Sequence, residues 1–177
     1  MAYSAGSGSD WDLIISDLAG TNSYVLDNNN LSGYASWYPD DNQMFSMAHI
    51  EGVFNIRYSI GLLSGSPSIT SYVPGKYPAV SPNGNYLAYM CGENLNLCLR
   101  DLRTGSEQTL YTIEYLRIND VRMPSNPVWS ADGQWIYFSS ANSGDWDIYR
   151  IHSNGSGLEN LTDDWGSSNE LTPAYQW

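Results

Sequence analysis

Short runs of alternating apolar and polar residues, separated by Gly-, Ser- and Asn-rich segments, fill the chain from end to end. The best-defined unit predicts a lead strand over Pro127–Ser130, a second strand over Trp135–Ser140 and a third over Trp146–His152. Ala-Asp-Gly at 131–133 and Asn-Gly at 154–155 have the side chains that tight turns need, because Asp and Asn bond their own backbone and Gly tolerates positive φ. No helical period competes with this pattern, so it predicts four short antiparallel strands per unit.

The same plan occurs four times along the chain. The matched segments are SDWDLIISDLAG from Ser9, VFNIRYSIGL from Val53, NLNLCLRDLRTG from Asn94 and DWDIYRIHSNGSG from Asp145. One polar residue recurs in them, and it is Asp12, Asn55, Asn96 and Asp147 in turn, at intervals of 43, 41 and 51 residues. A period of about 45 residues with four strands per unit is typical of β-propeller blades.

Residues at matched repeat positions are interpreted as architectural. Trp11 and Trp146 are expected to pack between blades, and Trp129 and Tyr175 occupy matched places in lead strands. The recurring polar residues Asp12, Asn55, Asn96 and Asp147 are expected to organise the loop before the third strand.

The segment NPVWSADGQWIYFSSANSGDWDIYRIHSNGSGLENLT, residues 126–162, closely resembles the repeat of TolB-like, or WD-repeat-like, β-propellers. The resemblance is clear in PAVSPNGNYLAYM and weaker in the second unit, where Asp41 replaces the turn glycine and Asn55 replaces Asp. It extends over nearly the whole chain. Members of that family serve as periplasmic protein-binding modules, as sensor or surface domains and as the propeller part of some peptidases, so the resemblance is specific for fold and weak for function.

The repeats predict a single all-β domain over 1–177, a propeller with four blades of four antiparallel strands. The expected blades are about 1–32 plus 171–177, 33–75, 76–122 and 123–170. Met1 aligns with Ile136, inside a second strand, and the terminal TPAYQW resembles NPVW, so the C-terminal strand is expected to complete the first blade. Three arrangements stay open: a four-bladed ring, two chains forming an eight-bladed ring, and a trimmed or engineered piece of a longer propeller. The resemblance implies rings of six to eight blades, which favours the two-chain ring and a homodimer.

Composition narrows the classes of partner. Of 177 residues, 42% are hydrophobic and 14% aromatic, which indicates a packed chain and not a disordered one. The net charge is −12 with only seven Lys and Arg, so we expect neither nucleic acid nor an anionic membrane surface as partner. No run approaches 18 apolar residues, so membrane insertion is not expected. The start lacks the pattern of a signal peptide, although a precursor can have carried one that was removed.

Loops at one end of the predicted blades carry the candidate binding residues, because binding concentrates on loops held by a rigid scaffold. The candidates are His49, Glu51, Glu93, Arg117, Asp120, Arg122, Asp145, Asp163, Asp164 and Trp165. The longest insertion, 113–124, contains Arg117 and Arg122 with Asp120 between them. A surface insertion held by Arg–Asp pairs explains this segment equally well. Trp165 has no counterpart in the other units and is the strongest aromatic candidate.

No catalytic residue, cofactor or metal is expected. The chain lacks a G-x-S-x-G motif, its histidines His49 and His152 fall at opposite blade ends, and no His/Cys cluster suits zinc. A glycosidase needs only two carboxylates, which could come from Glu51, Glu93, Asp145 and Asp163. No spacing in the sequence identifies a catalytic pair among these four residues. The sequence therefore favours a non-catalytic scaffold that presents its loops to a protein or peptide. The alternative is a carbohydrate-binding or glycan-processing propeller.

Cys91 and Cys98 flank the hairpin GENLNL. If the two residues face each other across the strands, a disulfide is geometrically allowed, and two buried thiols fit the sequence equally well. The family resemblance and the acidic composition together favour a periplasmic or secreted location.

Overall fold

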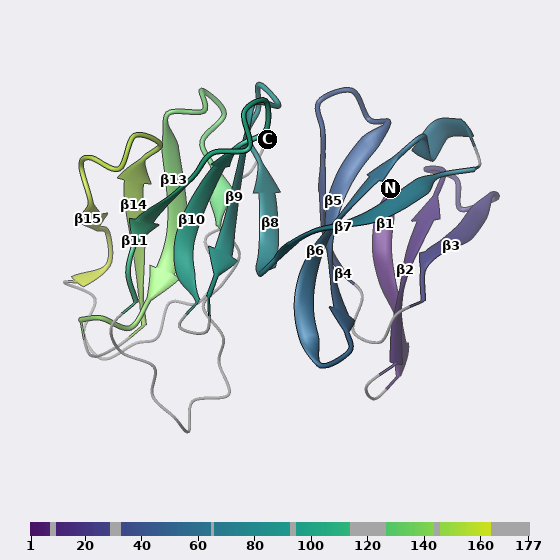
Figure 1. Cartoon of the computed structure of the whole chain (residues 1–177), viewed down its shortest axis with the longest axis horizontal. Coiled ribbons are helices and arrows are strands. Elements are labelled where there is room, and N and C mark those ends of the chain that lie inside the picture. The colour runs from purple at the N-terminus through teal and green to yellow at the C-terminus, as the bar shows by residue number, and fades with distance from the viewer. Residues whose placement is uncertain are drawn as a thin grey trace. The chain divides into compact units, whose positions relative to one another are not determined.

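The computed structural model describes residues 1–7, 10–28, 33–64, 66–92, 95–113, 127–143 and 146–163 (Figure 1). These residues form four antiparallel β-sheets and one short 3-10 turn, η1 (Leu62–Ser64). The all-β class predicted from the alternation is confirmed. The chain divides into two compact units, Met1–Pro78 and Ala79–Trp177.

Unit 1 contains the first two sheets. The first has the order β1-β2-β3, and the second has the order β4-β5-β6-β7. Their bounds are β1 (Ala2–Ser7), β2 (Asp10–Ser16), β3 (Ser23–Asp27), β4 (Gly33–Trp37), β5 (Gln43–Ile50), β6 (Val53–Ile60) and β7 (Ser68–Pro74). In both sheets, strands adjacent in sequence are adjacent in space, as expected for short hairpin connections. Residues 171–177, predicted to add a strand to the first sheet, lie outside the described residues.

Two more sheets follow, with the orders β11-β10-β9-β8 and β12-β13-β14-β15. Their bounds are β8 (Lys76–Val80), β9 (Tyr86–Cys91), β10 (Asn96–Asp101), β11 (Glu107–Tyr111), β12 (Val128–Trp129), β13 (Trp135–Ser140), β14 (Asp147–His152) and β15 (Glu159–Asn160). The second strand predicted for the best-defined repeat coincides with β13, and the third agrees with β14 within one residue.

Each unit has its own apolar interior. In unit 1, the cluster of buried side chains consists of Leu13, Ile15, Leu26, Met44 and Leu62. In unit 2, Trp129 is 6% exposed, and its indole N–H donates to the carbonyl oxygen of Ala79 at 3.0 Å. A buried Trp needs such a partner, so this bond ties β12 to β8 as well as filling space.

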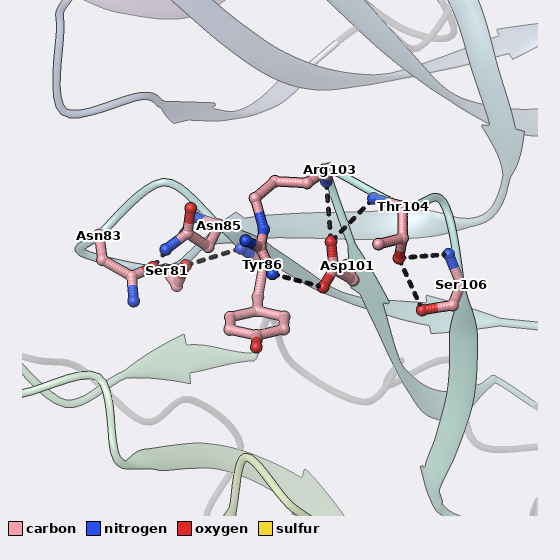
Figure 2. A network of polar contacts seen from close by, with 8 residues as sticks. All are labelled: Ser81, Asn83, Asn85, Tyr86, Asp101, Arg103, Thr104 and Ser106. Atoms are coloured by element: carbon pink, nitrogen blue, oxygen red, sulfur yellow. Dashed lines mark hydrogen bonds and ion pairs between the residues drawn. The ribbon is translucent and has the colours of Figure 1, made fainter.

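The turns follow the chemistry that the sequence predicted. Ser81 Oγ lies 2.8 Å from Asn83 Oδ1 and accepts the Tyr86 N–H at 2.9 Å, while Gly84 takes φ of 71° (Figure 2). Ser130 and Asp132 repeat this arrangement one repeat later. These side-chain bonds satisfy backbone groups that a tight turn otherwise leaves to solvent.

Asp41 stands where the equivalent turns have glycine, and it adopts their left-handed conformation, with φ of 56°. Asp and Asn tolerate this region better than other residues with a side chain. The turn in the weakest repeat is therefore preserved despite the missing glycine.

Cys91 and Cys98 form a disulfide with their Cα atoms 5.9 Å apart. The register differs from direct pairing, because Cys91 faces Asn96 and Cys98 faces Tyr89. The two cysteines are diagonal neighbours on one face of the β9–β10 hairpin. A displacement of two residues keeps both side chains on the same face, since the strand period is two.

Candidate binding pocket

A pocket of about 450 Å³ lies within unit 1. Its walls are Ser4 of β1, Trp11 of β2, Gly33 and Tyr34 of β4, Met47 of β5, Phe54 of β6 and Tyr77 of β8. The volume is within the range of small-ligand sites, and apolar walls with a few polar groups are typical of them.

A β-bulge at the start of β4 shapes one side of the pocket. Gly33 pairs with Met47 and Ser36 with Phe45, so β4 has one more residue than its partner strand between these two pairs. A Cβ added at Gly33 would lie 2.7 Å from Ser4 Oγ, so a larger residue there would displace the Ser4 hydroxyl. The bulge places Tyr34 at φ of 50°, and bulges of this kind redirect a side chain.

Tyr34 and Tyr77 occupy the same position of successive repeats, three residues before Trp37 and Val80. Both residues have a left-handed backbone conformation, with φ of 50° and 53°. Their rings meet edge to face, with centroids 4.7 Å apart. Each such conformation costs ~1–3 kcal/mol for a bulky residue, and such strain concentrates at ligand-binding sites. The contact between the two rings stabilises the folded chain by about 1 kcal/mol, which offsets part of this cost.

Tyr77 is 7% exposed, and Tyr34 is 50% exposed. Burial raises the pKa of Tyr77 to about 12, with a smaller contribution from Tyr34. The phenol of Tyr77 therefore remains protonated at neutral pH and can donate as well as accept a hydrogen bond.

Phe54 carries positively charged and aromatic neighbours. Lys76 Nζ lies 4.2 Å from the Phe54 ring centroid, and the His49 ring lies 4.6 Å away. The Gly75 N–H donates to the Phe54 carbonyl at 2.9 Å, which holds the segment carrying Lys76 and Tyr77 against β6. Burial lowers the pKa of Lys76.

Among the candidate loop residues, the structure brings His49 to the pocket wall through Phe54. Glu51 is exposed in the β5–β6 hairpin with φ of 49°, and Asp163 is exposed at the end of the described part of unit 2. The other candidates lie outside the described residues: Glu93, Arg117, Asp120, Arg122, Asp145, Asp164 and Trp165.

The recurring polar residues have different surroundings. Asp147 is 5% exposed and accepts hydrogen bonds from Ser143 Oγ, from Asn160 Nδ2 at 2.9 Å and from Thr162 Oγ1 at 3.1 Å. Asn96 Oδ1 accepts the Ile113 N–H at 3.0 Å. Both side chains thus fasten the segment that follows the fourth strand.

In the other two repeats, Asn55 Nδ2 donates to the Val53 carbonyl at 3.1 Å, and Asp12 is half-buried. Tyr175 lies outside the described residues.

Trp11 differs from its repeat counterpart Trp146. Trp146 is 4% exposed, whereas Trp11 is 37% exposed and lines the pocket. Repeat position therefore predicts the strand location of Trp11 but not its burial. The sequence signal that marks the pocket is the tyrosine shared by GYASW and KYPAV, which lies on a strand and not among the loop candidates.

Within the described ranges, no three His, Cys, Asp or Glu side chains are grouped to hold a metal ion. The same part of the chain has no helical segment able to span a bilayer.

No protein-family model matches the sequence. An uncharacterized protein of Agrobacterium fabrum is 32% identical over 116 residues, which are 61% of this chain and 37% of that protein. TolB from Acinetobacter baumannii has a TM-score of 0.68 at 18% identity, covering 90% of this chain and 40% of its own. A structure assigned as TolB from Agrobacterium tumefaciens has a TM-score of 0.67 at 23% identity, covering 92% and 62%.

These likenesses establish that the chain has the fold of TolB-like β-propeller repeats, as the repeat motifs predicted. The chain spans less than two thirds of either TolB structure and of the Agrobacterium fabrum protein. An enzyme with this type of fold is also similar: oligogalacturonate lyase from Vibrio parahaemolyticus, with a TM-score of 0.56 at 14% identity, covering 80% of this chain and 45% of its own.

Proposed function

We propose that the chain is a non-catalytic β-propeller binding module that holds a protein or peptide partner. The observation that carries this proposal is the pocket of unit 1, where four aromatic side chains surround a volume suited to an anchor residue. Aromatic side chains dominate the energetics of protein interfaces, and anchors that fill pockets are typical hot spots. The two TolB structures support a module of this fold.

The lining residues do not suit acid–base or nucleophilic catalysis. Ser4 is the one hydroxyl nucleophile of the usual Ser, Thr or Cys type among them, and a serine needs an adjacent base and an orienting acid. None of the lining residues is His, Asp or Glu. The pocket is therefore better suited to binding than to bond cleavage.

We infer that residues 171–177 supply the strand that the first sheet lacks among the described residues, within one chain or across a homodimer whose eight blades form one ring. The TPAYQW resemblance to NPVW supports this, and an added strand would cover the outer edge of β1. A disulfide in the β9–β10 hairpin favours a periplasmic or secreted location.

The alternative function is carbohydrate binding or glycan processing. The partly exposed rings of Trp11 and Tyr34 favour it, because exposed aromatic faces can stack on sugar rings. The likeness to an oligogalacturonate lyase is consistent with it at the level of fold.

A direct test selects phage-displayed dodecapeptides on the immobilised chain and, in parallel, applies the labelled chain to a glycan array. The proposal expects enriched peptides that bind in solution with micromolar affinity by calorimetry. Free dodecapeptides of scrambled sequence serve as the control. Saturable binding to glycans with no peptide enrichment would establish the alternative instead.

A further inference from the structure

We propose that the unit 1 pocket accepts an uncharged aromatic or large aliphatic side chain of the partner, from a segment rich in basic residues. This inference rests on the proposed function and specifies the chemistry of its ligand. It is carried by the wall composition, by the hydroxyl of the buried Tyr77 and by the net negative charge of unit 1.

The walls favour an apolar occupant. Trp11, Phe54, Tyr34 and Tyr77 supply rings, and Met47, which is 5% exposed, supplies a flexible thioether. Methionine adapts to the shape of an apolar ligand and makes favourable sulfur–aromatic contacts. Gly33 keeps the space next to Ser4 open, since a Cβ there would meet the Ser4 hydroxyl at 2.7 Å.

Tyr77 provides a polar group inside this apolar setting. Tyr77 is 7% exposed, and its ring meets that of Tyr34 edge to face. A phenol hydroxyl both donates and accepts hydrogen bonds, so Tyr77 offers a polar contact to a ligand in the pocket. A backbone carbonyl or a Trp indole N–H beside the anchor can form this hydrogen bond.

A cationic side chain does not suit the pocket. Aromatic cages bind cations well, but desolvating the cation also calls for a compensating charge. The lining has no carboxylate, and Lys76 Nζ already lies 4.2 Å from the centre of Phe54. A second positive charge there would be repelled by the first.

A sugar ring suits the pocket less well than an apolar anchor does. Ser4, Tyr34 and Tyr77 are the lining residues whose side chains can hydrogen-bond strongly, together with the indole N–H of Trp11. A pyranose presents hydroxyls around its whole edge, and each unpaired hydroxyl loses its hydration on binding. The apolar walls leave most of that edge without a partner.

The basic character of the partner segment follows from long-range charge. Unit 1 contains seven Asp and Glu but two Lys and Arg, and the whole chain has a net charge of −12. A surface of one sign attracts the opposite sign during encounter and accelerates association at low salt. The anchor therefore enters the pocket uncharged while the residues flanking it carry the complementary charge.

The pocket can be tested by NMR with ¹³C-methyl methionine, because the chain has five methionines and Met47 lines the site. Met47→Leu assigns the resonance. The probes are N-acetyl-L-tryptophanamide, N-acetyl-L-leucinamide, tetramethylammonium and methyl α-D-glucopyranoside. We expect the two amides to shift the Met47 methyl saturably, and the cation and the glycoside to leave it unmoved.

Tyr77→Phe removes the hydroxyl and keeps the ring, so it should weaken binding of N-acetyl-L-tryptophanamide about three- to tenfold, the usual worth of one hydrogen bond. Tyr3→Phe is the matched control, since Tyr3 lies on β1 outside the pocket lining. An unchanged methyl spectrum of each free variant, apart from residues next to the substitution, verifies that unit 1 remains folded.

A Met47 methyl that responds to neither amide overturns the inference. A saturable response to the glycoside or to tetramethylammonium that exceeds the response to the amides overturns it as well. If selected peptides bind the chain but neither move Met47 nor respond to Tyr77→Phe, the binding function stands and the pocket assignment is wrong. If the amides fill the pocket and no peptide is selected, the ligand chemistry stands and the proposed function is wrong.

Discussion

Asp27 and Arg57 form an ion pair inside unit 1, with Oδ2 and Nη1 2.9 Å apart. Their side chains are 3% and 15% exposed, and the pair joins the last residue of β3 to the middle of β6. The first and second sheets are thus linked by charge as well as by their shared apolar cluster.

Arg57→Met should lower the free energy of unfolding of unit 1 by about 3 kcal/mol, because it leaves the buried Asp27 carboxylate without its cation. Urea unfolding followed by circular dichroism measures this. Asp27→Asn combined with Arg57→Met should recover part of the loss. Arg103→Met is the control for an exposed pair, since Arg103 is 70% exposed, and its effect should stay below about 1 kcal/mol. If Arg57→Met and Arg103→Met lowered the free energy of unfolding equally, the stabilising role assigned to the buried Asp27–Arg57 pair would be wrong.

Asp147→Ala should cost about 2–3 kcal/mol, because Ser143, Asn160 and Thr162 all lose a buried charged acceptor. Asp12→Ala tests the same repeat position with a half-exposed side chain, and we expect less than about 0.5 kcal/mol. Thermal unfolding of the two variants beside the parent gives the comparison. A large loss for Asp12→Ala would show that the repeat position itself, and not local burial, decides the contribution.

The pKa of Asp17 is lowered from 3.8 to about 2, mainly by the hydrogen bond from the Thr21 hydroxyl and then by that from Asn22. Since the folded-state pKa lies below the unfolded-state value, the carboxylate stabilises the fold fully above about pH 4 and progressively less as the pH falls toward 2. Thr21→Val should move this pKa back toward 3.8 in a ¹³C carboxyl NMR titration. Thr104→Val, which alters a different turn, should leave the Asp17 titration unchanged.

Material made under oxidising conditions should contain no free thiol when it is unfolded without reductant, because Cys91 and Cys98 are bridged. Reduction should destabilise unit 2 by about 2 kcal/mol, the entropy expected for so short a loop. Thiol titration and urea unfolding with and without reductant measure both effects. The Cys91→Ser/Cys98→Ser variant should be insensitive to reductant, and two titratable thiols in the oxidised parent would contradict the prediction.

Deletion of residues 171–177 tests how the first sheet is completed. If this segment adds a strand beside β1, the deletion should lower the thermal midpoint far more than trimming an ordinary terminus does, because an exposed sheet edge is created. Light scattering reports the accompanying mass: a fall from dimer to monomer would indicate that the strand comes from a second chain. Unchanged midpoint and mass would show that the sheet is not completed in this way.

Local features of this protein were readable from the sequence. Asp132 and Gly133 specify a turn within four residues, and the alternation from Trp135 to Ser140 specifies one strand, because both depend on backbone preferences and side-chain direction over a few neighbours. Repetition of these local signals was enough to identify the class of fold. The turn also forms at Asp41, because aspartate tolerates the backbone conformation that glycine adopts in the equivalent turns.

The pocket and the strand register could be determined only from the tertiary structure. The displacement of Cys91 and Cys98 by two residues and the bulge that turns Tyr34 toward Tyr77 both arise from pairing between strands. Trp11 and Trp146 occupy the same repeat position, yet one lines a pocket and the other is buried. The physical reason is range: a turn or a strand is decided by neighbours along the chain, whereas a binding site is decided by which distant side chains the packed sheets bring together.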